Sequence, residues 1–286
     1  MFLNISAGRL SSWYKIPVGF VQAFWDLIRV KPDIVVSFGG YVALPVALSA
    51  WILGIPIVTH EQTRIPGLAN RIIGRIAVKI CLTFEDTEHR FSKKKVVITG
   101  LPIRRELFSS PKKPSFELPG GDVMYITGGS TGAVSMNELL FDLIPKLVKR
   151  YVVIHQTGVP SLTKASAIRN PRYIAKDFFD VKDVSWILYN AALVVGRSGA
   201  NTVMEVAMIG KPMICIPLPW SAGSEQFANA SWLVKKGLGA ILIQKDFTQS
   251  RFLGLIRTQK TKQTSFEVPF DGSERMAGVI NAILAS

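Results

Sequence analysis

The sequence has 286 residues, 48% of them hydrophobic and 19% charged, so it is long enough for two ordinary domains and too apolar for a disordered chain. Its formal net charge of +14 favours a polyanionic partner: nucleic acid, anionic lipid or a phosphorylated substrate. Cys81 and Cys215 stand in apolar runs typical of buried thiols in a reducing compartment. Because neither has metal-ligand spacing with His60, His89 or His155, we expect no metal site.

Residues 11–30 have the pattern of an amphipathic helix that is rich in aromatic side chains and flanked by Lys15 and Arg29. One face should pack on a sheet, while the remainder could lie at a membrane interface. The following stretch, residues 37–59, has no charge and is long enough to cross a bilayer. Glycines and prolines interrupt it, so we expect a strand over 33–37, a helix over about 44–53 and a strand over 55–59.

Polar residues follow both of these strands, at the edge where open α/β sheets bind ligands. The first strand ends in Gly39-Gly40-Tyr41, and the second ends in His60, Glu61 and Thr63. His60 and Glu61 could serve a ligand, or they could be a helix-capping pair. A helix with Arg71, Arg75 and Lys79 on a basic face comes next, and strands over 80–84 and 96–99 complete this half. Residues 108–121, rich in Ser, Pro, Lys and Gly, indicate an interdomain linker.

The second half repeats the pattern of strand, glycine turn and helix. After a strand over 122–127, Gly128-Gly129-Ser130-Thr131-Gly132 opens a helix that we expect to run to about Lys149. The glycines let backbone approach an anion, and Ser130 can donate to it. The loop is neither a Walker loop nor a GxGxxG motif. Further predicted elements are strands over 151–155, 211–217 and 240–243, and helices over 180–189, 225–236 and 276–285.

A buried strand over 192–195, a turn from Arg197 to Ala200 and a helix from Asn201 form the most informative stretch. An open helix N-terminus suits a phosphate, and Ser198, Asn201 and Thr202 can each satisfy free amides of its first turn. One turn later, Glu205 can accept both hydroxyls of a ribose, as acidic residues do in dinucleotide folds. The alternative is an ordinary junction of strand and helix with a solvated glutamate.

Together these motifs resemble the MurG family, transferases that use UDP-N-acetylglucosamine in peptidoglycan synthesis. Order and spacing match from about Ile5 to the last helix. The matching stretches are Gly39 to Val42, His60 to Gln62, Gly100 to Arg104, Gly128 to Ser130, His155 to Gly158, Arg197 to Ala200, Thr202 to Glu205, and Gln226 with Asn229-Ala230. The resemblance implies an α/β fold of the GT-B type, with two Rossmann-like doubly wound domains facing a cleft and neither metal nor cofactor.

The resemblance also implies domain limits and residue roles. An acceptor domain would span 1–107, a linker 108–121, a donor domain 122–270, and a last helix, 271–286, would pack back on the first domain. Arg104 and Ser130 would contact the donor diphosphate, Gln226 the sugar hydroxyls, and Val181 the uracil. The ribose and phosphates would lie against Ala200, Asn201, Thr202, Val203, Met204 and Glu205. Tyr41, His60, Glu61, Thr63 and Asn137 would face the acceptor side or support the cleft.

Several positions depart from the family pattern. Thr63, Thr131, Asn201 and Met204 stand where the family has Asn, Gln, Leu and Ser, and 221–225 lack its His/Asp-rich run. The family's first strand and glycine loop, which carries a histidine base, are also absent. We therefore expect an incomplete first domain. No base can be assigned, and His60 and Glu61 are weak substitutes.

The implied reaction is inverting transfer of N-acetylglucosamine from UDP-N-acetylglucosamine to the C4 hydroxyl of an undecaprenyl-diphospho-muramoyl-pentapeptide. The implied location is the cytoplasmic face of the bacterial membrane. The family has a membrane-facing patch at the positions that Trp51, Phe20 and neighbouring lysines occupy in this sequence. We therefore expect the protein to bind peripherally to an anionic membrane surface.

Three alternatives remain open. The chain could be a truncated UDP-sugar-binding protein without activity, or another transferase that moves a UDP-sugar to a lipid. A nucleic-acid binder fits the net charge, but the basic residues are scattered and no RNA or DNA motif is present, so we expect no nucleic-acid partner.

Overall fold

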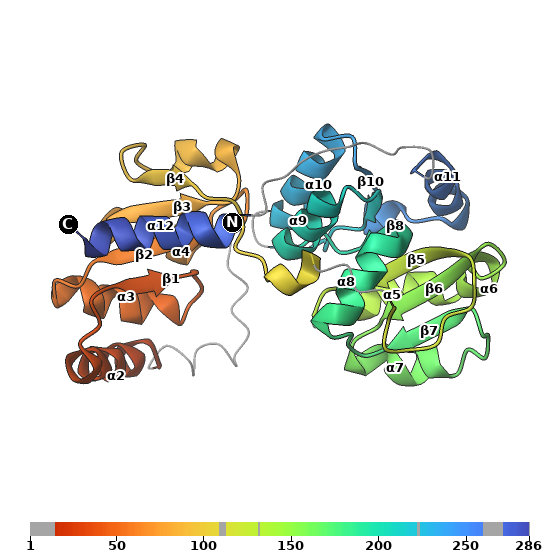
Figure 1. The fold of residues 1–286 in the computed structure, drawn as a ribbon, viewed down its shortest axis with the longest axis horizontal. Helices are drawn as coiled ribbons and strands as arrows, with labels where there is room; N and C mark the ends of the chain where they lie inside the picture. Colours follow the sequence, from red (N-terminus) through yellow and green to blue (C-terminus); the bar gives the residue numbers. More distant parts are fainter. Residues whose placement is uncertain (1–14, 109–112, 131, 222–223, 260–270, 286) are drawn as a thin grey trace. The chain divides into compact units, whose positions relative to one another are not determined.

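The protein forms two compact units (Figure 1). The structure, a computed structural model, describes residues 15–108, 113–130, 132–221, 224–259 and 271–285. The first unit combines Met1–Pro102 with Asp271–Ser286, and the second is Ile103–Phe270. The second unit is therefore formed by one continuous segment, whereas the first unit is formed by the two ends of the chain.

A four-stranded parallel sheet forms the centre of the first unit, in the order β1 (Val35–Ser37), β2 (Ile57–Glu61), β3 (Lys79–Leu82) and β4 (Val96–Ile98). Since successive side chains in a strand face opposite sides, Ile57 and Ile80 pack on one face of the sheet, and Val58 and Cys81 on the other. The first face is covered by α3 (Ala43–Ile52) and α4 (Leu68–Ile76), with Leu27 of α2 (Lys15–Val30) against it. On the second face lies α12 (Gly272–Leu284).

The uncharged stretch folds as strand, helix and strand, as predicted. It runs from the last residue of β1 through the ten-residue α3 into β2, and the apolar character of β2 reflects burial on both faces of a parallel sheet. In the described part of the chain, no helix has the length and apolarity needed to span a bilayer. The predicted start of the first helix, residues 11–14, lies outside the described residues.

The second unit contains a six-stranded parallel sheet with the order of a dinucleotide-binding fold. Its strands are, in spatial order, β10 (Gly239–Ile241), β9 (Met213–Cys215), β8 (Ala191–Gly196), β5 (Asp122–Thr127), β6 (Tyr151–Gln156) and β7 (Tyr173–Lys176). The strand order reverses between β5 and β8, which lie side by side, and in open α/β sheets ligands bind at this point. The helices are α5 (Val134–Phe141), α6 (Ile144–Leu147), α7 (Val159–Ser166), α8 (Val181–Asn190), α9 (Ala200–Ile209), α10 (Glu225–Lys235) and α11 (Gln249–Gln259).

Local chemistry explains where the elements differ from prediction. The helix expected to run to Lys149 is broken into α5 and α6, because Pro145 has no N–H and its ring clashes with the preceding turn. Lys79, expected on a helix face, is the first residue of β3. The sequence reading missed β7, α7, α11 and three short 3-10 helices, η1 (Glu85–Arg90), η2 (Arg105–Phe108) and η4 (Gln244–Asp246).

Candidate functional site

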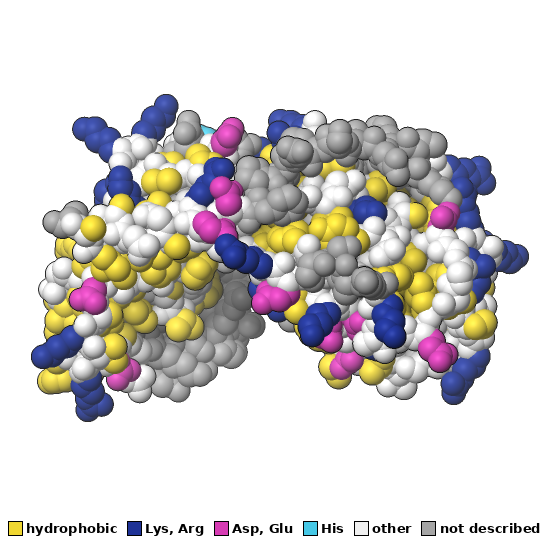
Figure 2. Space-filling view, viewed as in Figure 1, with side chains coloured by type: hydrophobic (Ala, Val, Ile, Leu, Met, Phe, Trp, Pro, Cys, Tyr) yellow, Lys and Arg dark blue, Asp and Glu magenta, His cyan; other side chains and the backbone are white. Residues whose placement is uncertain are grey.

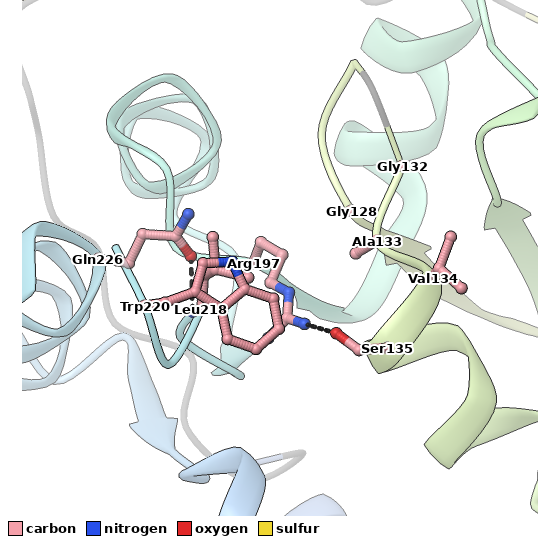
Figure 3. Close-up of a pocket in the computed structure, with 9 residues that line it drawn as sticks. All are labelled: Gly128, Gly132, Ala133, Val134, Ser135, Arg197, Leu218, Trp220 and Gln226. Atoms are coloured by element: carbon pink, nitrogen blue, oxygen red, sulfur yellow. Dashed lines mark hydrogen bonds between the residues drawn. The ribbon is translucent and has the colours of Figure 1, made fainter. Parts of the chain in front are cut away.

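A cavity of about 450 Å³ opens at the point where the strand order of the second unit reverses (Figure 3). Its walls come from the loop after β5, the turns after β8 and β9, and the start of α10. The lining residues are Gly128, Gly132, Ala133, Val134, Ser135, Arg197, Leu218, Trp220 and Gln226. Residues about a hundred positions apart in sequence thus share one cavity at the carboxyl edge of the sheet, where ligands are expected.

The glycine loop after β5 is held in a conformation that excludes larger side chains. Gly132 has a φ of +76°, and a Cβ atom there would lie 2.5 Å from the Thr157 carbonyl oxygen. The Gly129 N–H donates to the Thr127 hydroxyl at 3.1 Å. Ser130 is exposed, and Thr131 lies outside the described residues. α5 begins next, and its N-cap residue, Ala133, provides no side-chain hydrogen bond. The first-turn N–H groups can therefore meet an anion.

Arg197, directly after β8, is a buried cation that joins three segments around the cavity. Its guanidinium donates to the carbonyl oxygens of Ile216 and Pro217 at 3.0 and 3.2 Å, and to Ser135 Oγ and Gln244 Oε1 at 2.8 Å each. The Nε atom has no hydrogen-bond partner, and within the described residues no carboxylate pairs with this arginine.

Burial lowers the pKa of the Arg197 guanidinium to about 10. A cation that is enclosed in this way, with no counter-charge in the described part of the chain, favours an anionic ligand. The sequence analysis assigned no role to Arg197. It could have been found as a basic residue that directly follows an apolar strand, at the edge of the sheet where ligands bind.

The helix after Arg197 starts one residue earlier than predicted, at Ala200, and its N-cap is Gly199. The expectation that Ser198 caps it is wrong, since the Ser198 hydroxyl donates to the Gln226 carbonyl at 2.8 Å. Asn229 Nδ2 donates to the Ser198 carbonyl at 3.2 Å, which ties this turn to α10. Gly199 has no side chain to offer, so the opening N–H groups of α9 also remain available to a ligand.

The structure brings together two charged residues that the sequence had predicted for the site. Glu205 is half-buried in α9, where burial raises the pKa of its carboxyl group to about 7. The exposed Arg104 lies within electrostatic range and acts in the opposite direction, favouring the ionised carboxylate. Burial also raises the pKa of Tyr125 in β5, and the charge of Glu205 adds to that rise. The predicted phosphate contact and the predicted ribose contact therefore belong to one electrostatic group.

The remaining donor-side predictions differ in what they present to a ligand. The side chains of Val203 and Met204 are buried, so only their backbone is open to a nucleotide. Gln226 Oε1 accepts a hydrogen bond from the Leu218 N–H at 2.9 Å, and the amide nitrogen points away from that bond (Figure 3). Beside it stands Trp220, an exposed cavity residue that the sequence reading missed.

Val181 is the first residue of α8, whose N-cap Asp180 accepts from the Asp183 N–H at 2.8 Å. Asn201 is exposed and Thr202 half-buried at the opening of α9. These residues sit on the same carboxyl edge of the sheet as the cavity, without lining it.

In the first unit, His60 and Glu61 are enclosed and already hydrogen-bonded. His60 Nε2 lies 2.9 Å from the Gly100 carbonyl oxygen, Nδ1 has no hydrogen-bond partner among the described residues, and burial lowers the pKa of the imidazole. The Glu61 carboxylate accepts from the N–H and hydroxyl of Thr63, from Asn70 Nδ2, and from the Gly67 N–H.

Gly67 is the N-cap residue of α4, so Glu61 binds the backbone directly before that helix, but within the described residues His60 and Glu61 do not form a helix-capping pair. Neither side chain is open to solvent. Tyr41, by contrast, is 85% exposed at the same edge of the sheet.

Asn137, expected on the acceptor side, lies in the second unit and is fully buried in α5. Its amide donates to the Thr157 carbonyl at 2.8 Å, and its Oδ1 lies 3.1 Å from His155 Nε2. Burial lowers the pKa of His155 to about 3, so this imidazole is neutral. Asn137 therefore braces α5 against the end of β6. In the described residues, no group of three His, Cys, Asp or Glu side chains could hold a metal ion.

Comparisons with known proteins identify related sequences for both units. The family model described as the glycosyltransferase family 28 C-terminal domain matches residues 123–269, and the model of the N-terminal domain matches residues 3–82. A UDP-N-acetylglucosamine–N-acetylmuramyl-(pentapeptide) pyrophosphoryl-undecaprenol N-acetylglucosamine transferase of Treponema denticola is 34% identical, over 99% of this chain and 78% of the relative. A transferase of the same name, numbered 2, from Bacillus anthracis is 27% identical over 99% of the chain and 84% of the relative.

Solved structures support the same fold. The crystal structure of Acinetobacter baumannii MurG matches with a TM-score of 0.69 and 28% identity, covering all of this chain and 83% of that one. A UDP-GlcNAc 2-epimerase from Neisseria meningitidis, bound to UDP-GlcNAc, matches with a TM-score of 0.67 at 13% identity, over 99% of this chain and 84% of that one. At so low an identity the second match shows the fold alone.

Proposed function

The chain belongs to the MurG group of glycosyltransferase family 28, and we propose that it transfers N-acetylglucosamine from UDP-N-acetylglucosamine to an undecaprenyl-diphospho-muramoyl-pentapeptide. The observation that carries this proposal is the cavity at the β5–β8 reversal. The opening of α5 and a buried guanidinium that has no carboxylate partner among the described residues line this cavity. The uncapped opening of α9 lies at the same carboxyl edge of the sheet, and together these groups suit a nucleoside diphosphate.

In the proposed complex, the donor diphosphate lies at the openings of α5 and α9, near Arg104, Ser130 and Arg197. The ribose hydroxyls donate to Glu205, and the uracil lies beside Val181 at the start of α8. The sugar lies against Trp220, with the free amide of Gln226 donating to its hydroxyls. Support comes from the open helix termini, the shared electrostatics of Arg104 and Glu205, and the placement of Gln226 and Trp220 in the cavity wall.

The reaction is a displacement at the anomeric carbon. The C4 hydroxyl of the acceptor forms a bond to C1 while the bond from C1 to the diphosphate oxygen breaks, and the configuration inverts. Negative charge that develops on the leaving UDP is stabilised by the guanidinium groups of Arg104 and Arg197 and by helix N–H dipoles. The hydroxyl proton must pass to a base. His60 and Glu61, enclosed and hydrogen-bonded, are not proposed for that step.

We assign the acceptor and the membrane to the first unit. Hydrophobic side chains gather on the visible face of this unit (Figure 2). Exposed large hydrophobic side chains of this unit include Val21 and Trp25 on α2, and Trp51 and Ile52 on α3. Together with the net charge of +14, they suit peripheral binding to an anionic membrane on its cytoplasmic side. We therefore attribute the positive net charge to binding of anionic lipid and phosphorylated substrates, and not to binding of nucleic acid.

The donor half of the proposal can be tested by calorimetry on the full chain with UDP, UDP-N-acetylglucosamine and uridine. Arg104→Ala should weaken UDP binding about tenfold and leave uridine binding unchanged, since a charge-assisted phosphate contact is lost. Arg105→Ala, a neighbouring exposed arginine without an assigned role, is the matched control. If the wild-type chain binds neither UDP nor UDP-N-acetylglucosamine, the transferase assignment is wrong.

Transfer itself requires an assay with labelled donor and the lipid-linked acceptor. Incorporation of label into the lipid establishes the enzyme. Donor binding without transfer favours a UDP-sugar-binding protein that has no activity by itself, and transfer to a different lipid favours the other open alternative.

A further inference from the structure

Gln156, the last residue of β6, is a buried amide at the meeting point of three segments. Sequence analysis gave it no role beyond a motif, and it is not among the cavity-lining residues. Its carboxamide contacts the glycine loop after β5, the segment that leads into α8, and the middle of β5. The inference drawn from these contacts rests on the proposed function, because two of the three segments are the proposed phosphate and uracil sites.

Each end of the Gln156 carboxamide has a specific partner. Nε2 donates to the Gly129 carbonyl at 2.9 Å. Oε1 accepts from the Phe179 N–H at 3.2 Å, and the Tyr125 hydroxyl donates to the same oxygen at 3.4 Å. A side chain at this position must therefore carry both a donor and an acceptor and be long enough to reach both segments. A glutamine meets these requirements.

The glycine loop depends on such a tie. A Cβ atom at Gly129 would meet no atom of the described residues within 4 Å, so the backbone borders open space on that side. Its N–H bonds to Thr127, and its carbonyl accepts from the Gly132 N–H at 3.2 Å, both of which are local contacts. The bond from Gln156 is a long-range contact that links the loop to a neighbouring strand.

The other end of the amide positions the start of α8. Phe179 is buried, and it directly precedes the N-cap Asp180 and the proposed uracil neighbour Val181. With its N–H bound to Gln156, this segment cannot shift along β6 without breaking a buried hydrogen bond.

We propose that Gln156 is a positioning residue that sets the spacing between the phosphate-binding glycine loop and the uracil-binding segment. It touches no substrate. Its effect is to let one nucleotide engage both sites at once, so that binding the uridine moiety places the diphosphate correctly. Its loss should reduce the advantage of UDP over uridine, instead of weakening all ligands equally.

The first test uses Gln156→Met in the full chain, with UDP and uridine titrated in parallel by calorimetry. Methionine has a similar length and forms neither hydrogen bond. The ratio of the uridine to the UDP dissociation constant should fall about tenfold, and in the transfer assay the donor KM should rise by a similar factor with kcat little changed. Tyr173→Phe is the matched control. It removes the 2.9 Å bond from the Tyr173 hydroxyl to His155, the residue before Gln156 on β6, and it should leave the ratio of the two dissociation constants unchanged.

A second variant covers the case in which Gln156→Met does not fold. Gln156→Glu keeps the shape and the acceptor for Phe179, but its ionised form has no donor for Gly129. At pH 8 its ratio should be reduced relative to wild type at the same pH. At pH 5 a protonated carboxyl group can donate again, and the ratio should approach the wild-type value.

The outcomes separate this inference from the proposed function. If the wild type ignores UDP, both fail. If the wild type prefers UDP to uridine, and the folded Gln156 variants keep that preference at pH 8, the assigned function stands and the positioning role is wrong.

Discussion

Glu205 and Arg197 are charged side chains that are at least partly enclosed within the second unit. The pKa of Glu205 is raised and that of Arg197 is lowered, and both shifts favour the neutral form of the side chain. Desolvation is the main cause in both cases, because burial penalises a charge that water no longer stabilises. Such shifts cluster where a ligand later supplies the missing partner. Here the ligand would provide phosphate charge for Arg197 and ribose hydroxyls for Glu205.

The raised pKa of Glu205 has a defined consequence for stability. Because the folded state binds this proton more tightly than the unfolded state, the stabilising contribution is complete below pH 4.5 and is lost as the pH rises to about 7. Glu205→Gln removes the penalty, so at pH 8 the variant should be more stable than wild type by about 1 kcal/mol, and less so at pH 5. Thermal unfolding at the two pH values measures this difference.

The same substitution should act oppositely on ligand binding. The affinity of the wild type for UDP-N-acetylglucosamine, whose diphosphate has no terminal phosphate that titrates in this range, should rise between pH 6 and pH 8 as the carboxylate ionises, and Glu205→Gln should lack that rise. Glu117→Gln, which changes an exposed carboxylate, serves as the control for both measurements. Equal pH dependence in wild type and Glu205→Gln would show that Glu205 is not the titrating group.

Among the elements, the close pairing of β5 and β8 determines the geometry of the cavity floor. Gly196 pairs with Thr127 where both strands end, and a Cβ atom at Gly196 would lie 2.4 Å from the Thr127 carbonyl oxygen. The loops that carry Gly128 and Arg197 start at this point. The distance between these two loops therefore depends on how closely β5 and β8 approach each other.

Gly196→Ala should therefore destabilise the second unit by about 2 kcal/mol or more, since backbone, not a flexible side chain, must move. UDP binding should weaken as well. Gly254→Ala is the contrasting control: this glycine lies inside α11 with no atom within 4 Å of an added Cβ, and the change should stabilise by about 0.5–1 kcal/mol. Denaturant unfolding of both variants checks the prediction, which is wrong if Gly196→Ala unfolds at the wild-type midpoint.

On the scale of the whole molecule, the last helix belongs to the first unit although it follows the second in sequence. Met276 of α12 packs with Val58 and Cys81 on one face of the first sheet. The core of the second unit is a separate cluster that includes Met124, Ile126 and Phe252. Separate cores predict that damage to one unit can leave the other intact.

Met276→Asp tests this independence by placing a carboxylate in the packed face of α12. Undocking of the helix should expose the Cys81 thiol, whose pKa burial raises to about 11, and its labelling rate should increase about tenfold or more. Cys215 in the second unit, whose pKa burial raises to about 12, is the internal control and should stay protected. UDP affinity should not change. Peptide mapping after thiol labelling separates the two sites, and equal labelling of both would contradict the prediction.

Much of the fold was accessible from sequence because its determinants are local. Apolar runs bounded by glycine and proline located β2, β5 and β8, and the uncharged stretch around α3 was correctly divided into strand, helix and strand. The motifs that resemble MurG also led to the family to which the chain belongs. The proposed roles of Arg104 and Glu205 remain predictions, although the structure brings these residues into one electrostatic group.

Other features depended on which distant segments meet, and no local pattern specifies that. Glu61 reads in sequence as a candidate acid or base, yet in the fold it holds the loop before α4. Ser198 reads as a helix cap, yet its hydroxyl bonds to α10. The roles proposed for Arg197 and Gln156 rest on partners in other loops and strands, which only the fold identifies. Sequence alone determined most of the strands, turns and helices, although not β7, α7 or α11, because backbone preference and hydrophobic periodicity act over a few residues. Tertiary structure decided the cavity and its buried charges, because strand order and packing bring together groups that lie far apart along the chain.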